Sequence, residues 1–212
     1  LGGLVIWLTY ALGKGLWSDR VGRLAALVMT LSPYRLVIFS MILGHASSLM
    51  MLGLFALAMV KFVRNPARWG WALVGGLSLG LAISAPPLTA LSMGAAISLV
   101  TAMALPWRRL TVASVLSFGL ALGLFAVVLF GYNKALTGSA TLTPFKEWST
   151  SDRLGFGPEV GLEYWREKDK GHTLRKGLFK DVYFNLEALR ANQMGWGGVV
   201  FVLMAIPLFA RR

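Results

Sequence analysis

Long apolar runs separated by short polar stretches dominate the chain up to about residue 130. These runs are Leu1–Leu12, a second from Leu24 to Pro33, then Ser47–Val63, Trp69–Ile83, Leu88–Leu105 and Leu110–Phe130, and a seventh run, Trp196–Ala210, follows near the end. A helix needs about 20 apolar residues to cross the hydrocarbon core of a bilayer, and several runs approach that length. The pattern predicts an all-α, polytopic transmembrane helix bundle with about seven crossings.

The segment between the sixth and seventh runs is polar. The sequence therefore predicts three parts: transmembrane helices in residues 1–131, an extracytoplasmic segment in 132–195, and a last transmembrane helix in 196–212. Within the polar segment, Leu174–Leu189 carries leucine and valine on one face and charged residues elsewhere, which predicts an amphipathic helix lying on the bilayer. Thr173 is its expected N-cap.

Basic residues gather in alternate joints between the runs. The clusters are Lys14, Arg20 and Arg23, then Lys61, Arg64 and Arg68, then Arg108 and Arg109, and finally Arg211 and Arg212. If every run crosses once, all four clusters fall on one side, which the positive-inside rule makes cytoplasmic. The joints at Gly44–His45 and Pro86–Pro87 then face outward. The expected topology is multi-pass, in a membrane whose cytoplasmic face carries the basic joints.

Composition supports a membrane protein and argues against other classes. The chain is 56% hydrophobic and 14% charged, whereas soluble domains carry about a quarter charged residues. The net charge of +12 arises largely from the inner joints, because eight of the nine acids lie in residues 132–195. Nucleic acid is therefore not an expected partner. With no cysteine and two distant histidines, neither a metal site nor a cofactor is expected.

Two glycine pairs at helical spacing predict close helix contacts. They are Gly76-x-x-x-Gly80 and Gly119-x-x-x-Gly123, and small residues one turn apart let helix backbones approach in lipid. Arg35 follows a Ser-Pro break at the outer end of the second run. Its charge either snorkels to headgroups or meets a lipid-borne phosphate.

Several short motifs occur in an order that resembles one enzyme family. They are "DRVGRLAALVMTLSPYRLVIFSMILGHASSLMMLGLFAL", "GLSLGLAISAPPLTAL", "YNKALTGSATLTPFKEW" and "DRLGFG…GHT…L…MGW". Together they resemble the integral-membrane GT-C glycosyltransferases, in particular bacterial relatives of the protein mannosyltransferase and aminoarabinose transferase group. The resemblance covers nearly the whole chain and rests on the order and spacing of the motifs.

The resemblance implies transfer of a sugar from a polyprenyl-phosphate donor to an acceptor on the extracytoplasmic face. Such a displacement needs a base on the acceptor hydroxyl and positive or hydrogen-bonding groups on the departing phosphate. Pro86 stands where the family commonly has arginine. The family's catalytic carboxylate lies in a loop after its first transmembrane helix, so the expected base lies upstream of Leu1, in the remainder of the same polypeptide.

The outer segment supplies candidate binding residues for this chemistry. Arg153 and His172 are candidates for the donor phosphate, and Phe156 is a candidate for stacking on a sugar or lining the cavity. Asp152, His45 and Arg35 complete the candidate substrate-binding set. Each also has a structural explanation: Asp152 can pair with Arg153 in a glycine turn, and the histidines can cap helices. A transporter subunit or a non-catalytic lipid-binding membrane protein remains the alternative.

Overall fold

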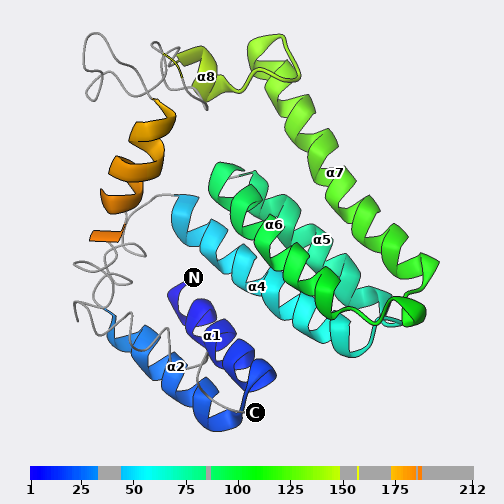
Figure 1. The fold of residues 1–212 in the computed structure, drawn as a ribbon. Coiled ribbons are helices and arrows are strands. Elements are labelled where there is room, and N and C mark those ends of the chain that lie inside the picture. The colour runs from blue at the N-terminus through cyan, green and yellow to red at the C-terminus, as the bar shows by residue number, and fades with distance from the viewer. Residues whose placement is uncertain (33–43, 85–86, 149–156, 158–172, 185, 188–212) are drawn as a thin grey trace. The chain divides into compact units, whose positions relative to one another are not determined.

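The structure is a computed structural model, and it describes residues 1–32, 44–84, 87–148, 157, 173–184 and 186–187. These residues form helices joined by short loops, without a β-strand (Figure 1). The chain divides into two compact units, residues 1–128 and 129–212. The predicted all-α class is confirmed, and each unit is described by itself below.

The first two helices form a tight hairpin. Helix α1 spans Gly2–Leu16 and α2 spans Asp19–Leu31. The hydroxyl of Ser18 caps α2 by accepting a hydrogen bond from the Val21 backbone N–H at 3.3 Å. Sequence analysis placed Lys14, Arg20 and Arg23 in a loop, and that prediction was wrong because the cap at Ser18 starts a helix directly after α1. Helix α2 ends before Pro33, as predicted.

Four further helices begin within residues 44–112. Their bounds are α4 Gly44–Arg64, α5 Trp69–Ile83, α6 Pro87–Ala104 and α7 Val112–Thr137, with a single 3-10 turn at Trp107–Arg109 before α7. The third, fourth and fifth apolar runs match α4, α5 and α6 to within a few residues at each end. Helix α7 continues about two turns beyond the predicted end at Phe130. The seventh run, 196–210, lies outside the described residues.

Helices that follow one another along residues 1–128 alternate in direction, whereas some that pack side by side are parallel. Gly53 of α4 lies beside Leu8 of α1, and Gly15 lies beside Val60, so α1 and α4 run in parallel. Along α5, Gly75 meets Met59 of α4, whereas Gly76 meets residues 118 to 122 of α7 and Gly80 meets Phe125. The short joint at residues 65–68 brings the chain straight back along α4. Helix α5 is therefore antiparallel to α4 and parallel to α7.

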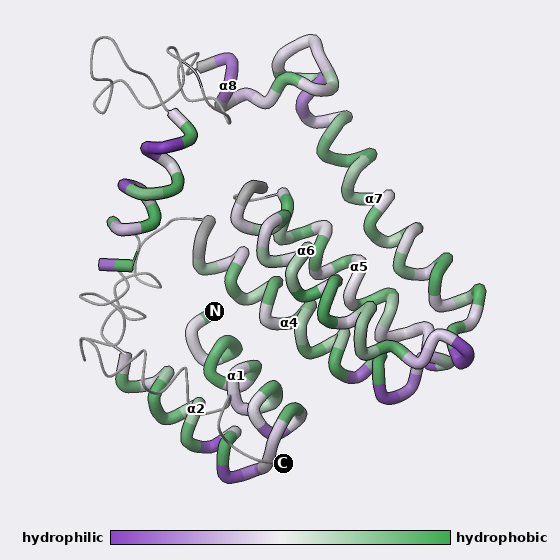
Figure 2. The backbone as a smooth tube through the Cα atoms, viewed as in Figure 1, coloured by the Kyte–Doolittle hydropathy of each residue, from purple (hydrophilic) through white to green (hydrophobic). Residues whose placement is uncertain are grey.

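This alternation brings the basic residues of the unit to one end. A guanidinium nitrogen of Arg64 donates to the carbonyl oxygen of Gly15, and the Ser114 hydroxyl donates to the Pro66 carbonyl at 2.7 Å. These contacts join the α1–α2 turn, the α4–α5 joint and the start of α7. Figure 2 shows hydrophilic residues at these joints and apolar residues along the helices. We refer to this region as the basic end and to the opposite region, where α4 begins, as the neutral end.

The core of the unit lies where α4, α5 and α6 meet. Phe55 is fully buried there, and its ring lies 6.4 Å from that of Phe118 on α7. Aromatic pairs in this range contribute about 0.5–1.5 kcal/mol beyond their buried area. Leu52, Met59 and Leu79 fill the space around Phe55. The core is built from apolar side chains of unequal size, which is how closely packed helices interdigitate.

One predicted glycine contact is confirmed and the other is wrong. A Cβ atom added at Gly76 would lie 2.5 Å from the Phe118 carbonyl oxygen, and one at Gly80 would lie 2.5 Å from the Phe125 ring. The glycines therefore let α5 and α7 touch. Gly119 and Gly123 have open space where a Cβ would stand. Helix α7 is rotated so that these two glycines face away from α5.

Two described helices are long and apolar enough to cross a membrane: Ala46–Arg64 within α4, and α7. Helix α7 has 26 residues, so it is about 39 Å long. Only 11% of its most apolar window is buried in the protein, whereas 44% of that of α4 is buried. Helices α5 and α6 are apolar but shorter.

Unit 129–212 contributes the end of α7, a short helix and part of the predicted amphipathic helix. Helix α8 spans Pro144–Trp148. Residues 174–187 are helical where described, with a π-helical turn, η3, at Lys176–Asp181. The Thr173 hydroxyl accepts a hydrogen bond from the Lys176 N–H at 3.2 Å, so the predicted N-cap is confirmed. Leu178, Phe179 and Val182 are exposed on this helix.

The α5–α7 contact gives a test of the packing. We expect Gly76→Ala to lower stability by about 1–3 kcal/mol, because its methyl group meets the Phe118 backbone and forces the helices apart. Gly119→Ala is the matched control: it meets open space and replaces a helical glycine by a better helix former. Thermal unfolding of the detergent-purified protein measures both. A Gly76→Ala protein as stable as Gly119→Ala would contradict this packing.

Candidate functional site

Most of the predicted site residues lie outside the described part of the chain. Asp152, Arg153 and Phe156 belong to residues 149–156, His172 belongs to 158–172, and Arg35 belongs to 33–43. Their placement relative to one another therefore stays a prediction. His45 is the second residue of α4, at the neutral end.

The start of α4 is suited to an anion. The first four N–H groups of any α-helix have no partner within the helix, and the aligned peptide dipoles give that end a partial positive charge. Phosphates bind at such helix ends in many proteins. Helix α4 is 21 residues long and has no acidic residue in its first turn. The start of α4 thus carries a partial positive charge, and the described helices of residues 1–128 place no Asp, Glu, Lys or Arg at this end.

Ser48 adds a free hydroxyl one turn into the same helix. Its side chain is 3% exposed, and its oxygen has no hydrogen-bond partner. Other helical hydroxyls bond to the carbonyl four residues earlier, for example Thr9 to Val5 at 2.8 Å and Ser78 to Val74 at 2.7 Å. A buried hydroxyl without a partner costs about 1–3 kcal/mol. Ser48 is therefore an unsatisfied polar group within the packed part of α4.

Part of the motif "YNKALTGSATLTP" has a structural role. The Asn133 side chain is buried and donates to the Ala140 carbonyl at 3.2 Å. The Thr137 hydroxyl lies 2.9–3.0 Å from the carbonyls of Asn133, Ser139 and Leu142, and it accepts from the Ser139 N–H. Gly138 follows with φ of 75°, a conformation that favours glycine. These residues end α7 and turn the chain.

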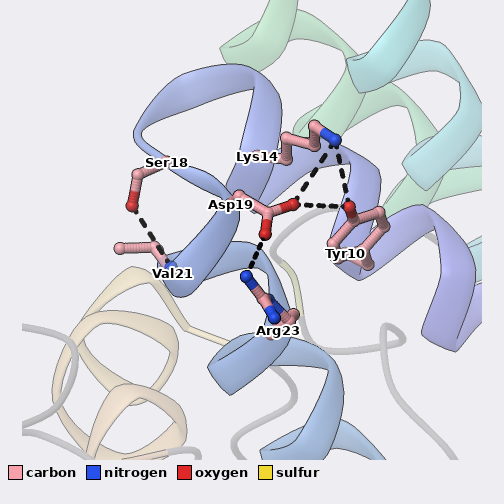
Figure 3. A network of polar contacts seen from close by, with 6 residues as sticks. All are labelled: Tyr10, Lys14, Ser18, Asp19, Val21 and Arg23. Atoms are coloured by element: carbon pink, nitrogen blue, oxygen red, sulfur yellow. Dashed lines mark hydrogen bonds and ion pairs between the residues drawn. The ribbon is translucent and has the colours of Figure 1, made fainter.

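At the basic end, a polar network joins α1 to α2 (Figure 3). The Tyr10 hydroxyl donates to Asp19 Oδ1 at 2.7 Å, and Lys14 Nζ lies 3.4 Å from the same oxygen. Arg23 pairs with the other carboxylate oxygen. The hydrogen bond from Tyr10 lowers the pKa of Asp19 below its usual value of 3.8, and the neighbouring cations act in the same direction. The same tyrosine and Asp19 raise the pKa of Lys14.

The close approach of α1 and α2 makes this network possible. A Cβ at Gly22 would lie 2.7 Å from the Tyr10 carbonyl oxygen, and one at Gly13 would lie 2.8 Å from Gly22 Cα. The glycine pair brings the two backbones into contact, so the side chain of Asp19 reaches Tyr10 and Lys14. This network holds the hairpin together, and its carboxylate is fully used by internal partners.

The described residues hold no candidate metal site, and the acid at the basic end is paired. Among residues 1–32, 44–84 and 87–148, and in the described stretches near 180, no three histidine, aspartate or glutamate side chains converge as a metal site would require. The acid in residues 1–128, Asp19, is engaged by cations at the basic end. At the neutral end, the groups of interest are the start of α4 and the unpaired hydroxyl of Ser48.

Comparisons with family models, curated proteins and solved structures found no match.

Sequence reasoning missed Ser48 and the α1–α2 network. Serine is common in apolar helices, and whether its hydroxyl bonds to the preceding turn depends on the rotamer that its neighbours allow. The network had a usable signal in the sequence: Ser18 followed by Asp19 is a helix start, and Asp19 and Arg23 are four residues apart on one helix face.

The α1–α2 network predicts a pH-dependent stability. Because the pKa of Asp19 is lowered on folding, its contribution is present above about pH 4 and is lost as the pH falls through the folded-state pKa. We expect Asp19→Asn to lower the melting temperature at pH 7, and the difference from the unmodified protein to shrink on acidification.

Arg20→Gln is the control, since Arg20 is exposed and lies next to Asp19 in the chain. It should leave the melting temperature unchanged. A difference between Asp19→Asn and the unmodified protein that is the same at pH 7 and at pH 2.5 would show that the charge of Asp19 has no role.

Proposed function

We propose that this chain is part of a membrane glycosyltransferase that moves a sugar from a polyprenyl-phosphate donor to an acceptor on the extracytoplasmic face. The ordered motifs that resemble the GT-C group suggest the reaction. In this proposal the chain crosses the inner membrane about seven times, with the basic end in the cytoplasm and the neutral end outside. The donor's lipid tail stays in the bilayer while its phosphate reaches the neutral end.

The membrane part of the proposal is supported by the exposure of α7. A 39 Å apolar helix that is nearly unburied in the protein needs an apolar environment, and a bilayer core about 30 Å thick provides one. The gathering of Lys14, Arg64 and Arg109 at one end of alternating helices supports the orientation, because basic joints are retained in the cytoplasm.

The single observation that carries the binding role is the unpaired, buried hydroxyl of Ser48 near the start of α4. Phosphate oxygens accept hydrogen bonds from hydroxyls and from the N–H groups of a helix start. His45 belongs to the same helix start. We propose that the donor phosphate binds at this end of α4. Arg153 and His172 stay donor-binding candidates from the sequence alone.

A transporter is less well supported. Transport coupled to ions or protons uses ionisable residues within the spans. In α4 the charged residues are Lys61 and Arg64, near its last turn, and in α7 the one charged residue is Lys134, near its end. The middle of both helices is uncharged.

The binding proposal predicts a particular combination of effects for Ser48→Ala. In the full-length protein, donor use should weaken by about 0.5–1.5 kcal/mol, the usual contribution of a hydrogen bond, while the melting temperature without donor stays equal or rises. The rise follows because the change removes an unsatisfied buried oxygen. Arg153→Ala and His172→Ala should each weaken donor use by about 1.5–3 kcal/mol, the range for bonds to charged groups.

Two controls separate site effects from general ones. Ser78→Ala removes a hydroxyl that already bonds to the Val74 carbonyl, so donor use should be unchanged. Lys168→Ala removes a charge from the same outer segment and should have little effect. If Lys168→Ala weakens donor use as much as Arg153→Ala and His172→Ala do, or if Ser48→Ala leaves it intact, the site is wrongly assigned.

A further inference from the structure

A cavity of about 250 Å³ lies between helices at the basic end of residues 1–128. Its walls come from four helices and the 3-10 turn, and they include Phe62 of α4, Ala102 of α6, Trp107 and Leu110 around the turn, and Phe118 of α7. The site described above lies near the start of α4, whereas this cavity lies near its end. The two are therefore separate.

The cavity presents an almost wholly apolar surface. Three hydroxyls belong to its lining, and two of them bond to backbone carbonyls: Thr101 to Ile97 at 2.7 Å, and Ser114 to Pro66 at 2.7 Å. These two therefore offer little to a polar ligand. The volume is below the 300–1,000 Å³ of ordinary small-molecule sites, which fits a segment of a hydrocarbon chain better than a whole ligand.

Two arginines lie within the turn that borders the cavity. Trp107 and Leu110 both line it, and the residues between them in the chain are Arg108 and Arg109, both exposed. The chain thus places two cations next to an apolar hollow, a combination that matches a molecule with an anionic head and an apolar tail.

No carboxylate of the same unit is free to pair with these arginines. Asp19 is the one acid in residues 1–128, and it is engaged by Tyr10, Lys14 and Arg23. Two adjacent guanidinium groups without an internal counter-charge attract anions from outside, and each offers five N–H donors suited to phosphate.

The surfaces beside the cavity are also apolar and exposed. Met103 on α6 and Val112 on α7 are 80% and 75% exposed, and they flank the turn in the chain. An acyl chain entering from a surrounding bilayer would pass over these side chains. A free phosphate ion would use the arginines but leave the hollow empty.

We propose that this cavity and its two arginines form a binding site for an anionic phospholipid, with one acyl chain in the cavity and the headgroup phosphate on Arg108 and Arg109. The site lies at the opposite end of the unit from the proposed donor site. It therefore does not depend on the glycosyltransferase proposal, and it would hold for a non-catalytic membrane protein as well.

Native mass spectrometry of the full chain, released from detergent, tests this site. The probes are dioleoyl phosphatidylglycerol, dioleoyl phosphatidylcholine, short-chain dihexanoyl phosphatidylglycerol and inorganic phosphate. We expect tightest retention of dioleoyl phosphatidylglycerol. The double variant Arg108→Gln/Arg109→Gln should weaken it by at least about tenfold, because it removes charge-assisted hydrogen bonds. Ala102→Phe, which fills the cavity, should weaken it similarly.

Matched controls carry the same chemical changes elsewhere. Arg20→Gln/Lys61→Gln removes two exposed charges at the same end, and Ala104→Phe adds a ring at an exposed position of α6. Both should retain dioleoyl phosphatidylglycerol within about twofold, since neither change touches the cavity. If Ala102→Phe melts well below Ala104→Phe, the smaller Ala102→Leu replaces it in the comparison.

Three results would overturn the proposal. The first is equal retention of the two dioleoyl lipids, which would remove the role of the anionic head. The second is retention of dihexanoyl phosphatidylglycerol or inorganic phosphate as tight as that of the long-chain lipid, which would remove the role of the cavity. The third is an effect of Arg20→Gln/Lys61→Gln as large as that of the Arg108/Arg109 variant, which would indicate general electrostatics.

Discussion

A charge placed midway along an apolar helix in hydrocarbon costs about 2.5–3.5 kcal/mol even on lenient insertion scales. In the proposed membrane setting, the placement of charges in residues 1–128 avoids that cost. All eight of its described basic residues lie at one end of alternating helices, and its one acid lies there too. Because the charged residues lie at the helix ends, the middle of each helix packs through apolar side chains and glycine. The neutral end is left with helix dipoles and hydroxyls as its polar groups.

The helix bounds could largely be predicted because apolar runs and prolines record them directly. Helix α5 begins and ends where its run does, and Pro33 and Pro87 mark the breaks beside α2 and α6. The error at the α1–α2 hairpin has a clear cause. Charged residues predict a loop, but Lys14 belongs to the last turn of α1, and Arg20 and Arg23 belong to the first turns of α2 behind the Ser18 cap. Asp19 pairs with Lys14 and Arg23.

Helix rotation could not be predicted from the glycine spacing alone. Gly76 and Gly119 sit in identical motifs, yet only the first meets a neighbour, because Phe118 and Phe125 turn α7 toward α5. The same limit applies to the candidate site. Sequence reasoning picked residues by type, and five of its six candidates fall outside the described residues. The structure adds the Ser48 hydroxyl and the cavity beside Trp107. Both result from the way the helices pack, which the sequence does not specify residue by residue.

The central claim is that the basic end faces the cytoplasm while the polar segment after α7 lies outside. The chain has no cysteine, so single substitutions at Asn65, Trp107 and Ser149 report on one position each. In intact cells, a membrane-impermeant thiol reagent should label the cysteine at 149 and leave those at 65 and 107 unlabelled until the membrane is permeabilised. Labelling at 65 or 107 from outside would contradict the account.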